Sequence, residues 1–255
     1  MLSSTPRLLC AGRHTLIAPG KEISVPPQPA ALTGLASDPE PSGRGATRIQ
    51  VAAAVRNALL TGRFIPGKAV TLRGLAKELG VSPMPVREVI QRLAAEKALE
   101  IQPNGRVQVP QMSRTRFDEI LKTRLLLEPE LAAMALGGLS APDVRELERI
   151  DEHLDESLKS GDAEAYMQLN HAFHFRLYEA AGSEIMLPMV ESLWLQFAPF
   201  MRTVYGRVGT VSLVDQHREA IAAITAKDTE RLRRAIAADI ADGMGIIGRE
   251  NLAGP

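Results

Sequence analysis

Cysteine is almost absent from this sequence of 255 residues, which contains only Cys10. A single cysteine excludes an internal disulfide and a cysteine-based zinc finger, and it fits a reducing, cytoplasmic setting. No apolar run approaches the ~18 to 20 residues that cross a bilayer, so the sequence predicts no membrane partner. A phosphate-binding loop, a nucleotide fingerprint and an independent catalytic nucleophile are also missing, which counts against an enzyme.

An excess of charge of one sign is missing too, since 30 Lys and Arg side chains balance 30 Asp and Glu. The balance conceals an asymmetry along the chain. Residues 45–112 carry 10 basic and four acidic side chains, whereas residues 113–255 carry 16 and 23. A basic segment, typical of a partner such as nucleic acid, therefore precedes an acidic one.

Residues 1–45 have too little chance of packing to form part of a core. Proline and glycine interrupt the segment repeatedly, at Pro26, Pro27, Pro29, Gly34, Pro39, Pro41, Gly43 and Gly45. The composition predicts a disordered N-terminal extension.

Helical spacing of apolar residues begins at residue 46 and predicts three helices before residue 98. The second follows a possible Thr71 cap and ends where Gly80 allows a left-handed exit. Only Val81 separates that exit from Ser82, which can cap the third helix with Pro83 at its first position. The third helix buries one stripe, Val86, Val89, Ile90 and Leu93, and turns another outward, Met84, Arg87, Glu88 and Gln91. Two helices joined in this way predict a helix-turn-helix whose outward face enters a major groove.

A β-hairpin follows these helices. Leu99 and Ile101 are expected on one side of a first strand, and Val107 and Val109 on one side of a second, joined through Asn104-Gly105. Together with the positive charge, the pattern predicts a winged helix-turn-helix DNA-binding domain over residues 46–112.

The run LRGLAKELGVSPMPVREVIQRLAAEKALEIQPNGRVQV closely resembles the winged helix-turn-helix of the GntR family of bacterial transcriptional regulators. The resemblance implies that Arg73 and Arg87 hold phosphates and guanines, that Gly105 lies close to the minor groove, and that Ser82 and Arg106 lie beside them. Met84 joins this DNA-binding set from its place on the outward face. An ion pair of Arg87 with Glu88 or Glu96 is the alternative.

Two positions depart from the family's pattern. Many members have an arginine where this chain has Pro83, which removes one expected DNA contact. Lys97 stands where a glycine usually closes the recognition helix, so that exit is either not left-handed or mildly strained.

Residues 113–250 predict an all-helical domain of six helices, at 114–136, 141–159, 163–181, 184–206, 210–225 and 228–249. Its expected core faces include Leu125, Leu126, Leu131, Ala132 and Met134. The fold class is therefore mainly α, with a winged helix-turn-helix followed by a helical bundle.

Four polar residues stand at inward positions of this domain: Asn170, His174, His217 and Asp239. Burying two imidazoles, an amide and a carboxylate is costly unless they find partners, and one divalent metal ion would serve all four. Satisfied core histidines with a structural hydrogen bond are the alternative. His171, rotated off this face, is expected to face solvent or an interface.

This part of the chain resembles the FCD effector domain, which often follows a GntR-type DNA-binding domain. The segments that carry the resemblance are RLLLEPELAAMA, NHAFHFRLYEAAGS, QHREAIAAI and AIAADI. Members of that family often hold a divalent metal with an aspartate and three histidines. The matching positions here are Asn170, His174, His217 and Asp239, so the first and last depart from the commonest set. Imidazole ligation favours zinc or nickel, while the oxygen donors also admit manganese or iron.

The resemblance further implies that a small carboxylate effector binds against the metal. Arg124 is a candidate clamp for that carboxylate, and an ion pair with Glu128 is the alternative. The leading hypothesis is a homodimeric regulator, a repressor, on a palindromic operator. The rivals are a metal hydrolase with Asp239 or Glu219 as base, and a regulator that senses the metal itself.

Overall fold

The computed structural model describes residues 43–208 and 216–252; residues 1–42, 209–215 and 253–255 lie outside the described residues. The predicted N-terminal extension therefore falls almost wholly outside them, and its last three residues belong to the first helix. The elements in chain order are α1 (Gly43–Leu60), β1 (Val70–Thr71), α2 (Leu72–Glu78), α3 (Pro83–Ala95), β2 (Glu100–Ile101), β3 (Arg106–Gln108), α4 (Arg114–Ala135), α5 (Ala141–Ser160), α6 (Ala163–Glu179), α7 (Met186–Val208), α8 (His217–Ala226) and α9 (Thr229–Leu252).

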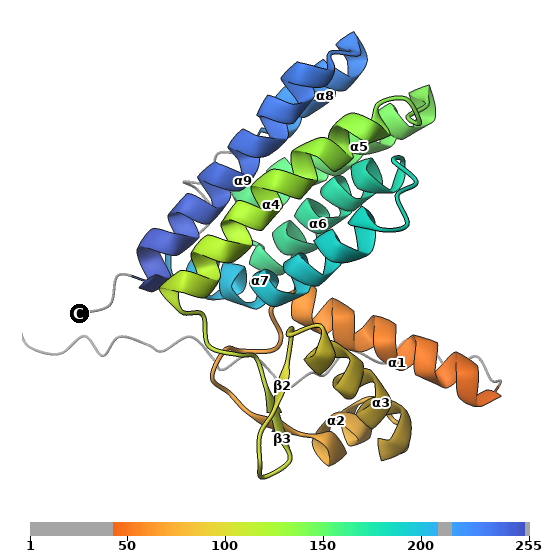
Figure 1. The fold of residues 1–255 in the computed structure, drawn as a ribbon, viewed down its shortest axis with the longest axis vertical. Coiled ribbons are helices and arrows are strands. Elements are labelled where there is room, and N and C mark those ends of the chain that lie inside the picture. Colours follow the sequence, from red (N-terminus) through yellow and green to blue (C-terminus); the bar gives the residue numbers. More distant parts are fainter. Residues whose placement is uncertain (1–42, 209–215, 253–255) are drawn as a thin grey trace, which may run out of the picture. The chain divides into compact units, whose positions relative to one another are not determined.

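The elements α1 to β3 form the winged helix-turn-helix that the sequence predicts (Figure 1). Strand β3 lies between β1 and β2 and pairs antiparallel with both. Strands β2 and β3 are the predicted wing hairpin, whereas β1 is too short for its alternation to be recognised in the sequence. Leu99 is buried but Ile101 is 43% exposed, so the expectation that they share one side is wrong. Leu99 precedes β2, and the alternation of a strand does not extend to it.

Local capping explains where the helices of this domain begin and end. The Thr71 hydroxyl accepts a hydrogen bond from the backbone N–H of Gly74 at 3.0 Å, as an N-cap should. Gly80 has φ 65° and gives the predicted left-handed exit. Lys97 has φ 59°, so the recognition helix also exits left-handed, here at a residue that adopts this conformation with strain. Ser82 occupies the N-cap position of α3, but its side chain makes no capping hydrogen bond.

Helices α4 to α9 run side by side as the predicted all-helical bundle (Figure 1). Helix α4 packs against α6, α7 and α9, while α5 packs against α6 and α8. Five of the six predicted helices match within three residues at each end. The remaining one, expected at 210–225, begins at His217, and residues 210–215 lie outside the described part of the chain. The largest fully buried side chains of the bundle are Trp194, Tyr178, Phe173 and Phe197.

The outer side of α4 differs from expectation. Leu126 is 66% exposed and Met134 is 46% exposed, so neither belongs to the core face where the sequence placed them. A groove of about 350 Å³ opens nearby, lined by Thr123 and Leu127 of α4 and by Pro188, Met189, Ser192 and Leu193 of α7. Part of the surface of this bundle is therefore apolar. Within the described residues, every helix is too short or too polar to cross a membrane.

Candidate DNA-binding face and metal centre

The six residues predicted to contact DNA are all exposed on the winged helix-turn-helix. They are Arg73 in α2, Ser82 at the N-cap of α3, Met84 and Arg87 in α3, and Gly105 and Arg106 in the wing. Met84 is 65% exposed, and an exposed apolar side chain beside arginines suits contact with a thymine methyl group. Contact with DNA by these residues stays a prediction.

The alternative partners of Arg87 are engaged elsewhere. Glu88 lies 3.6 Å from Arg48, and Glu96 lies 3.1 Å from Arg56. Arg87 itself is exposed on the outer side of α3. Its guanidinium is therefore placed to reach a guanine edge or a phosphate.

The tip of the wing depends on Gly105. Its φ of 76° is a left-handed conformation, and a side chain there would point into open space. The Asn104 carboxamide oxygen accepts a hydrogen bond from the backbone N–H of Arg106 at 3.0 Å, which closes the turn. Glycine thus permits both the turn and a close approach of the backbone to a groove.

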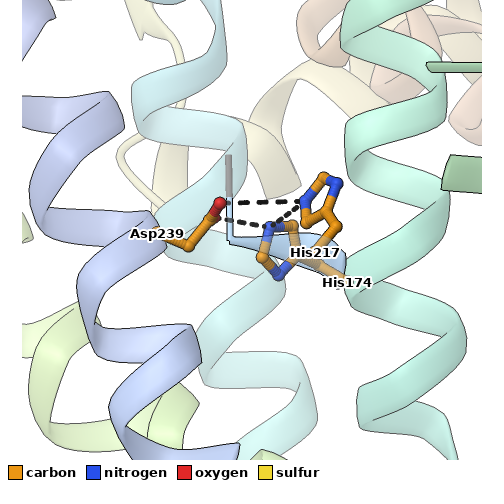
Figure 2. Close-up of side chains that lie close together, drawn as sticks. All are labelled: His174, His217 and Asp239. Carbon is orange, nitrogen blue, oxygen red and sulfur yellow. Dashed lines mark hydrogen bonds and ion pairs between the residues drawn. The ribbon is translucent and has the colours of Figure 1, made fainter. Parts of the chain in front are cut away.

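In the helical domain, His174 of α6, His217 of α8 and Asp239 of α9 point toward one another (Figure 2). His174 Nε2 lies 3.1 Å from Asp239 Oδ2 and 3.4 Å from His217 Nε2, and His217 Nε2 lies 3.9 Å from Asp239 Oδ1. Both imidazoles are buried, and the Asp239 side chain is 12% exposed. Three of the four predicted metal ligands therefore converge.

Two of these three separations fit a shared divalent ion, and the third, 3.9 Å between His217 Nε2 and Asp239 Oδ1, is wider. Two atoms that each lie ~2.1 Å from one ion are about 3.0 to 3.4 Å apart at octahedral and tetrahedral angles. The distances from His174 Nε2 to Asp239 and to His217 fall within or very near this range. Nitrogen and carboxylate oxygen are also the donor types that such an ion takes.

The Asp239 carboxyl is held in its charged form. Burial raises its pKa, but the hydrogen bond from His174, the charges of His217 and His174, and the backbone N–H of Gln216 at 3.1 Å together bring the pKa well below its usual range. An ionised carboxylate at this position is what a cation requires.

Asn170 lies one helical turn before His174 on α6 and is also buried. Its amide remains the predicted fourth ligand. His171, in contrast, does not simply face outward as expected. Its ring stacks on Phe175 at 4.1 Å between centroids and meets Trp194 at 5.5 Å, and its Nε2 is buried without a hydrogen-bond partner. Burial, with a smaller effect of the charge of His174, lowers the His171 pKa to about 4.

Two side chains that sequence reasoning missed contact the opposite ring nitrogens of the two histidines. Tyr178 Oη lies 3.1 Å from His174 Nδ1, and Asp151 Oδ1 lies 3.5 Å from His217 Nδ1. A signal for both exists in the sequence. Asp151 interrupts the apolar stripe of α5, and Tyr178 stands four residues after His174 on the same helix face.

Arg124 adopts the alternative that the sequence left open, because it pairs with Glu128. Arg124 Nε donates to Glu128 Oε1 at 2.5 Å and Nη2 donates to Oε2 at 3.3 Å, with both side chains buried. The guanidinium also lies 4.5 Å from the ring centroid of Trp194. An effector carboxylate would therefore share this guanidinium with Glu128.

Of the two bases considered for a hydrolase, Asp239 belongs to this cluster and Glu219 lies outside it. Glu219 is exposed and pairs with Arg231 at 2.7 Å. The groups at the metal cluster are thus suited to hold an ion rather than to supply a separate carboxylate base.

Polar contacts join the helix-turn-helix to α7 of the bundle. Arg56 of α1 bonds both Glu96 at 3.1 Å and Glu191 of α7 at 2.5 Å. The Ser192 hydroxyl donates to the backbone carbonyl of Glu96 at 3.3 Å. Both sets of contacts include Glu96, the C-cap residue of the recognition helix α3.

Comparison with known families decides what these two parts are. Residues 47–109 match the family described as "Bacterial regulatory proteins, gntR family", and residues 119–242 match the FCD domain. The chain thus joins a GntR-family DNA-binding domain to an FCD domain. A protein with these two domains is a transcriptional regulator and not an enzyme, as the sequence predicts.

Similar proteins match this chain across both domains. It is 29% identical over 202 residues to the HTH-type transcriptional regulator McbR of Escherichia coli (strain K12), covering 78% of this chain and 91% of McbR. It is 26% identical over 160 residues to the gluconate operon transcriptional repressor of Bacillus subtilis (strain 168), covering 63% and 64%. The solved structure of E. coli McbR/YncC matches with a TM-score of 0.76 and 28% identity, over 80% of this chain and 98% of that one.

Proposed function

We propose that this GntR-family regulator is a cytoplasmic, homodimeric repressor of a palindromic operator, and that a small carboxylate bound against a metal ion in the FCD domain controls its operator affinity. The observation that carries the proposal is the convergence of His174, His217 and Asp239 from three helices. An ion held there ties α6, α8 and α9 together.

The charge of the cluster supports an anionic effector. Two neutral imidazoles, the amide of Asn170 and the single carboxylate of Asp239 leave one net positive charge once a divalent ion is bound. When bound, the ion supplies Lewis-acid attraction for a carboxylate. Imidazole donors favour zinc or nickel as that ion. The name of the B. subtilis relative, a repressor of a gluconate operon, is consistent with an organic acid as the signal.

Arg124 is the proposed second contact of the effector. Its guanidinium is buried and fixed by Glu128 and Trp194, so it offers a positive charge without a flexible side chain. A carboxylate that shares Arg124 with Glu128 would loosen the contact between α4 and its neighbours.

The exposed set Arg73, Ser82, Met84, Arg87, Gly105 and Arg106 is proposed to hold the operator. The recognition helix α3 would read base edges in the major groove, and the wing would lie over the minor groove. A palindromic operator requires two copies of this face, which supports the homodimer. Leu126 of α4 and Met189 of α7, 66% and 50% exposed, supply an apolar surface for the second copy.

The test measures metal content by mass spectrometry on protein purified without chelator, followed by operator titrations with and without candidate organic acids. We expect about one equivalent of metal and an operator affinity that changes with an acid by roughly 5- to 150-fold. In the same assay His217→Ala should lose the metal, and His153→Ala is its matched control, because His153 is exposed on α5. An operator affinity that responds to the metal alone would indicate a metal sensor. Metal-free protein that responds fully to an acid would contradict the proposed site.

A further inference from the structure

A buried hydrogen-bond chain leads away from the metal cluster. His174 Nδ1 lies 3.1 Å from the Tyr178 hydroxyl, and that hydroxyl donates to Glu128 Oε2 at 2.8 Å. All three side chains are fully buried. The chain connects α6, which carries a proposed ligand, to α4.

The direction of the hydrogen bonds in this chain follows from the chemistry of its far end. Glu128 also accepts hydrogen bonds from Arg124 and, at 3.1 Å, from Trp194 Nε1, and both of these groups can only donate. Tyr178 has one proton, which it donates to Glu128, so toward His174 it can only accept.

The direction of these hydrogen bonds determines which ring nitrogen of His174 carries a proton. A hydroxyl that accepts at Nδ1 requires the ring to carry a proton there. Nε2 faces His217 and Asp239, and the proton through which it bonds the Asp239 carboxylate is the one that a bound ion would displace. At His217 the contact is longer: the Asp151 carboxylate lies 3.5 Å from Nδ1, an ion-pair distance, while Nε2 faces the cluster. Both imidazoles thus present the same nitrogen to the same point.

We propose that Tyr178, held by Glu128, and Asp151 are positioning residues that keep the protons of His174 and His217 on Nδ1, so that both Nε2 lone pairs are available to one divalent ion. The inference rests on the proposed metal site and adds to it the groups that orient its ligands. Partners of this kind fix ring orientation and raise the basicity of a ligating histidine.

The test uses the full-length protein and zinc as the probe, in competition with a chromophoric chelator. Tyr178→Phe removes the acceptor and keeps the ring, so its zinc affinity should fall roughly 10- to 100-fold. Tyr166→Phe, which removes a hydroxyl from another buried tyrosine of α6, is the matched control and should leave the affinity unchanged. Asp151→Ala should weaken binding in the same way, and Asp151→Asn, which keeps an oxygen acceptor, should restore part of it.

A second readout does not depend on zinc. Nitrogen-15 NMR of the metal-free protein should show His174 Nδ1 protonated, and in Tyr178→Phe the Nδ1 resonance should move toward the unprotonated position. Melting of the metal-free variants reports whether they fold. Wild-type protein that binds no zinc would overturn the proposed metal site, whereas equal zinc affinity in folded wild type and Tyr178→Phe, or an unchanged Nδ1 resonance, would overturn this inference.

Discussion

Arg56 of α1 donates a hydrogen bond through Nη1 to Glu191 of α7 at 2.5 Å, while its Nη2 donates to both carboxylate oxygens of Glu96 at 3.1 Å. One guanidinium therefore holds the end of the recognition helix against a helix of the FCD domain. Helix α7 also carries Trp194, whose indole N–H reaches the buried Glu128. A movement of α7 caused by an effector would reach the DNA-binding helix through this contact.

Arg56→Gln should reduce the effect of the effector on operator affinity while leaving stability nearly unchanged. The ion pairs are partly exposed, so their loss should cost less than about 1 kcal/mol of folding free energy. The coupling, expected at about 1 to 3 kcal/mol, should fall toward zero. Operator titration with and without the acid measures it, and Arg92→Gln, an exposed arginine of α3, is the control. Full coupling in Arg56→Gln would show that the signal takes another route.

Arg87→Ala should weaken binding to the specific operator by about 1 to 3 kcal/mol if Arg87 reads a guanine. Arg73→Ala should instead weaken binding to all sequences alike and make the dependence of affinity on salt less steep, because a phosphate contact carries no sequence information. Fluorescence anisotropy at several salt concentrations separates the two results. If neither variant changed operator affinity, the proposed contact face would be incorrect.

His217→Ala should remove the metal and lower the melting temperature of the FCD domain. An ion that binds only the folded bundle contributes its binding free energy to stability, about 2.7 kcal/mol at a free concentration one hundred times Kd. A chelator should lower the melting temperature of the wild type and leave that of His217→Ala unchanged. A chelator effect that persists in the variant would place the ion elsewhere. Operator affinity without effector should stay close to wild type, since the contact face lies on the separate helix-turn-helix.

Stability should fall as the pH falls from 6.5 to about 4, and His171 should account for part of the loss. Its pKa is about 4 in the folded protein, chiefly because burial disfavours the charged ring, against an ordinary value of 6.5. The unfolded chain therefore takes up the proton first, which favours unfolding by up to about 3 kcal/mol at the low end of this window. Urea denaturation of metal-free His171→Phe across this range should show a shallower slope than wild type, and exposed His153→Phe should not. Equal slopes in wild type and His171→Phe would contradict the assignment.

Leu126→Glu should weaken the dimer without unfolding the monomer. The side chain is 66% exposed, so in the monomer the change should alter stability by less than about 0.5 kcal/mol. A charge buried against a second copy would raise the dimer dissociation constant roughly tenfold or more. Sedimentation measures the constant, with Gln168→Glu on the exposed side of α6 as the control. An unchanged constant would assign the dimer to another surface.

The recognition helix could be predicted from the sequence because its determinants are local. Ser82 and Pro83 mark its start, and the stripe that includes Val86 and Leu93 faces inward as its spacing predicts. The ligand histidines could be found for the same reason, since each is a polar residue at an inward position of an apolar stripe.

The remaining features depend on which helices are neighbours, and periodicity does not contain that information. Leu125, Leu126 and Leu127 span more than half of the circumference of α4, so their spacing alone could not show that Leu126 remains uncovered. The roles of Asp151 and Tyr178 could not be predicted from the sequence, because they depend on the contacts of these residues with His217 and His174 in the folded bundle.

The buried carboxylate of Glu128 constrains how this sequence can change over generations. It receives donors from α4, α6 and α7, so replacing Arg124 alone leaves an uncompensated buried charge at a cost of about 3 to 5 kcal/mol. Joint replacement of Arg124 and Glu128 by apolar residues removes that charge, but it leaves the buried Tyr178 hydroxyl and Trp194 indole N–H without their acceptor, at about 1 to 3 kcal/mol each. In a library randomised at both positions and selected for folding, survivors should therefore usually keep both residues.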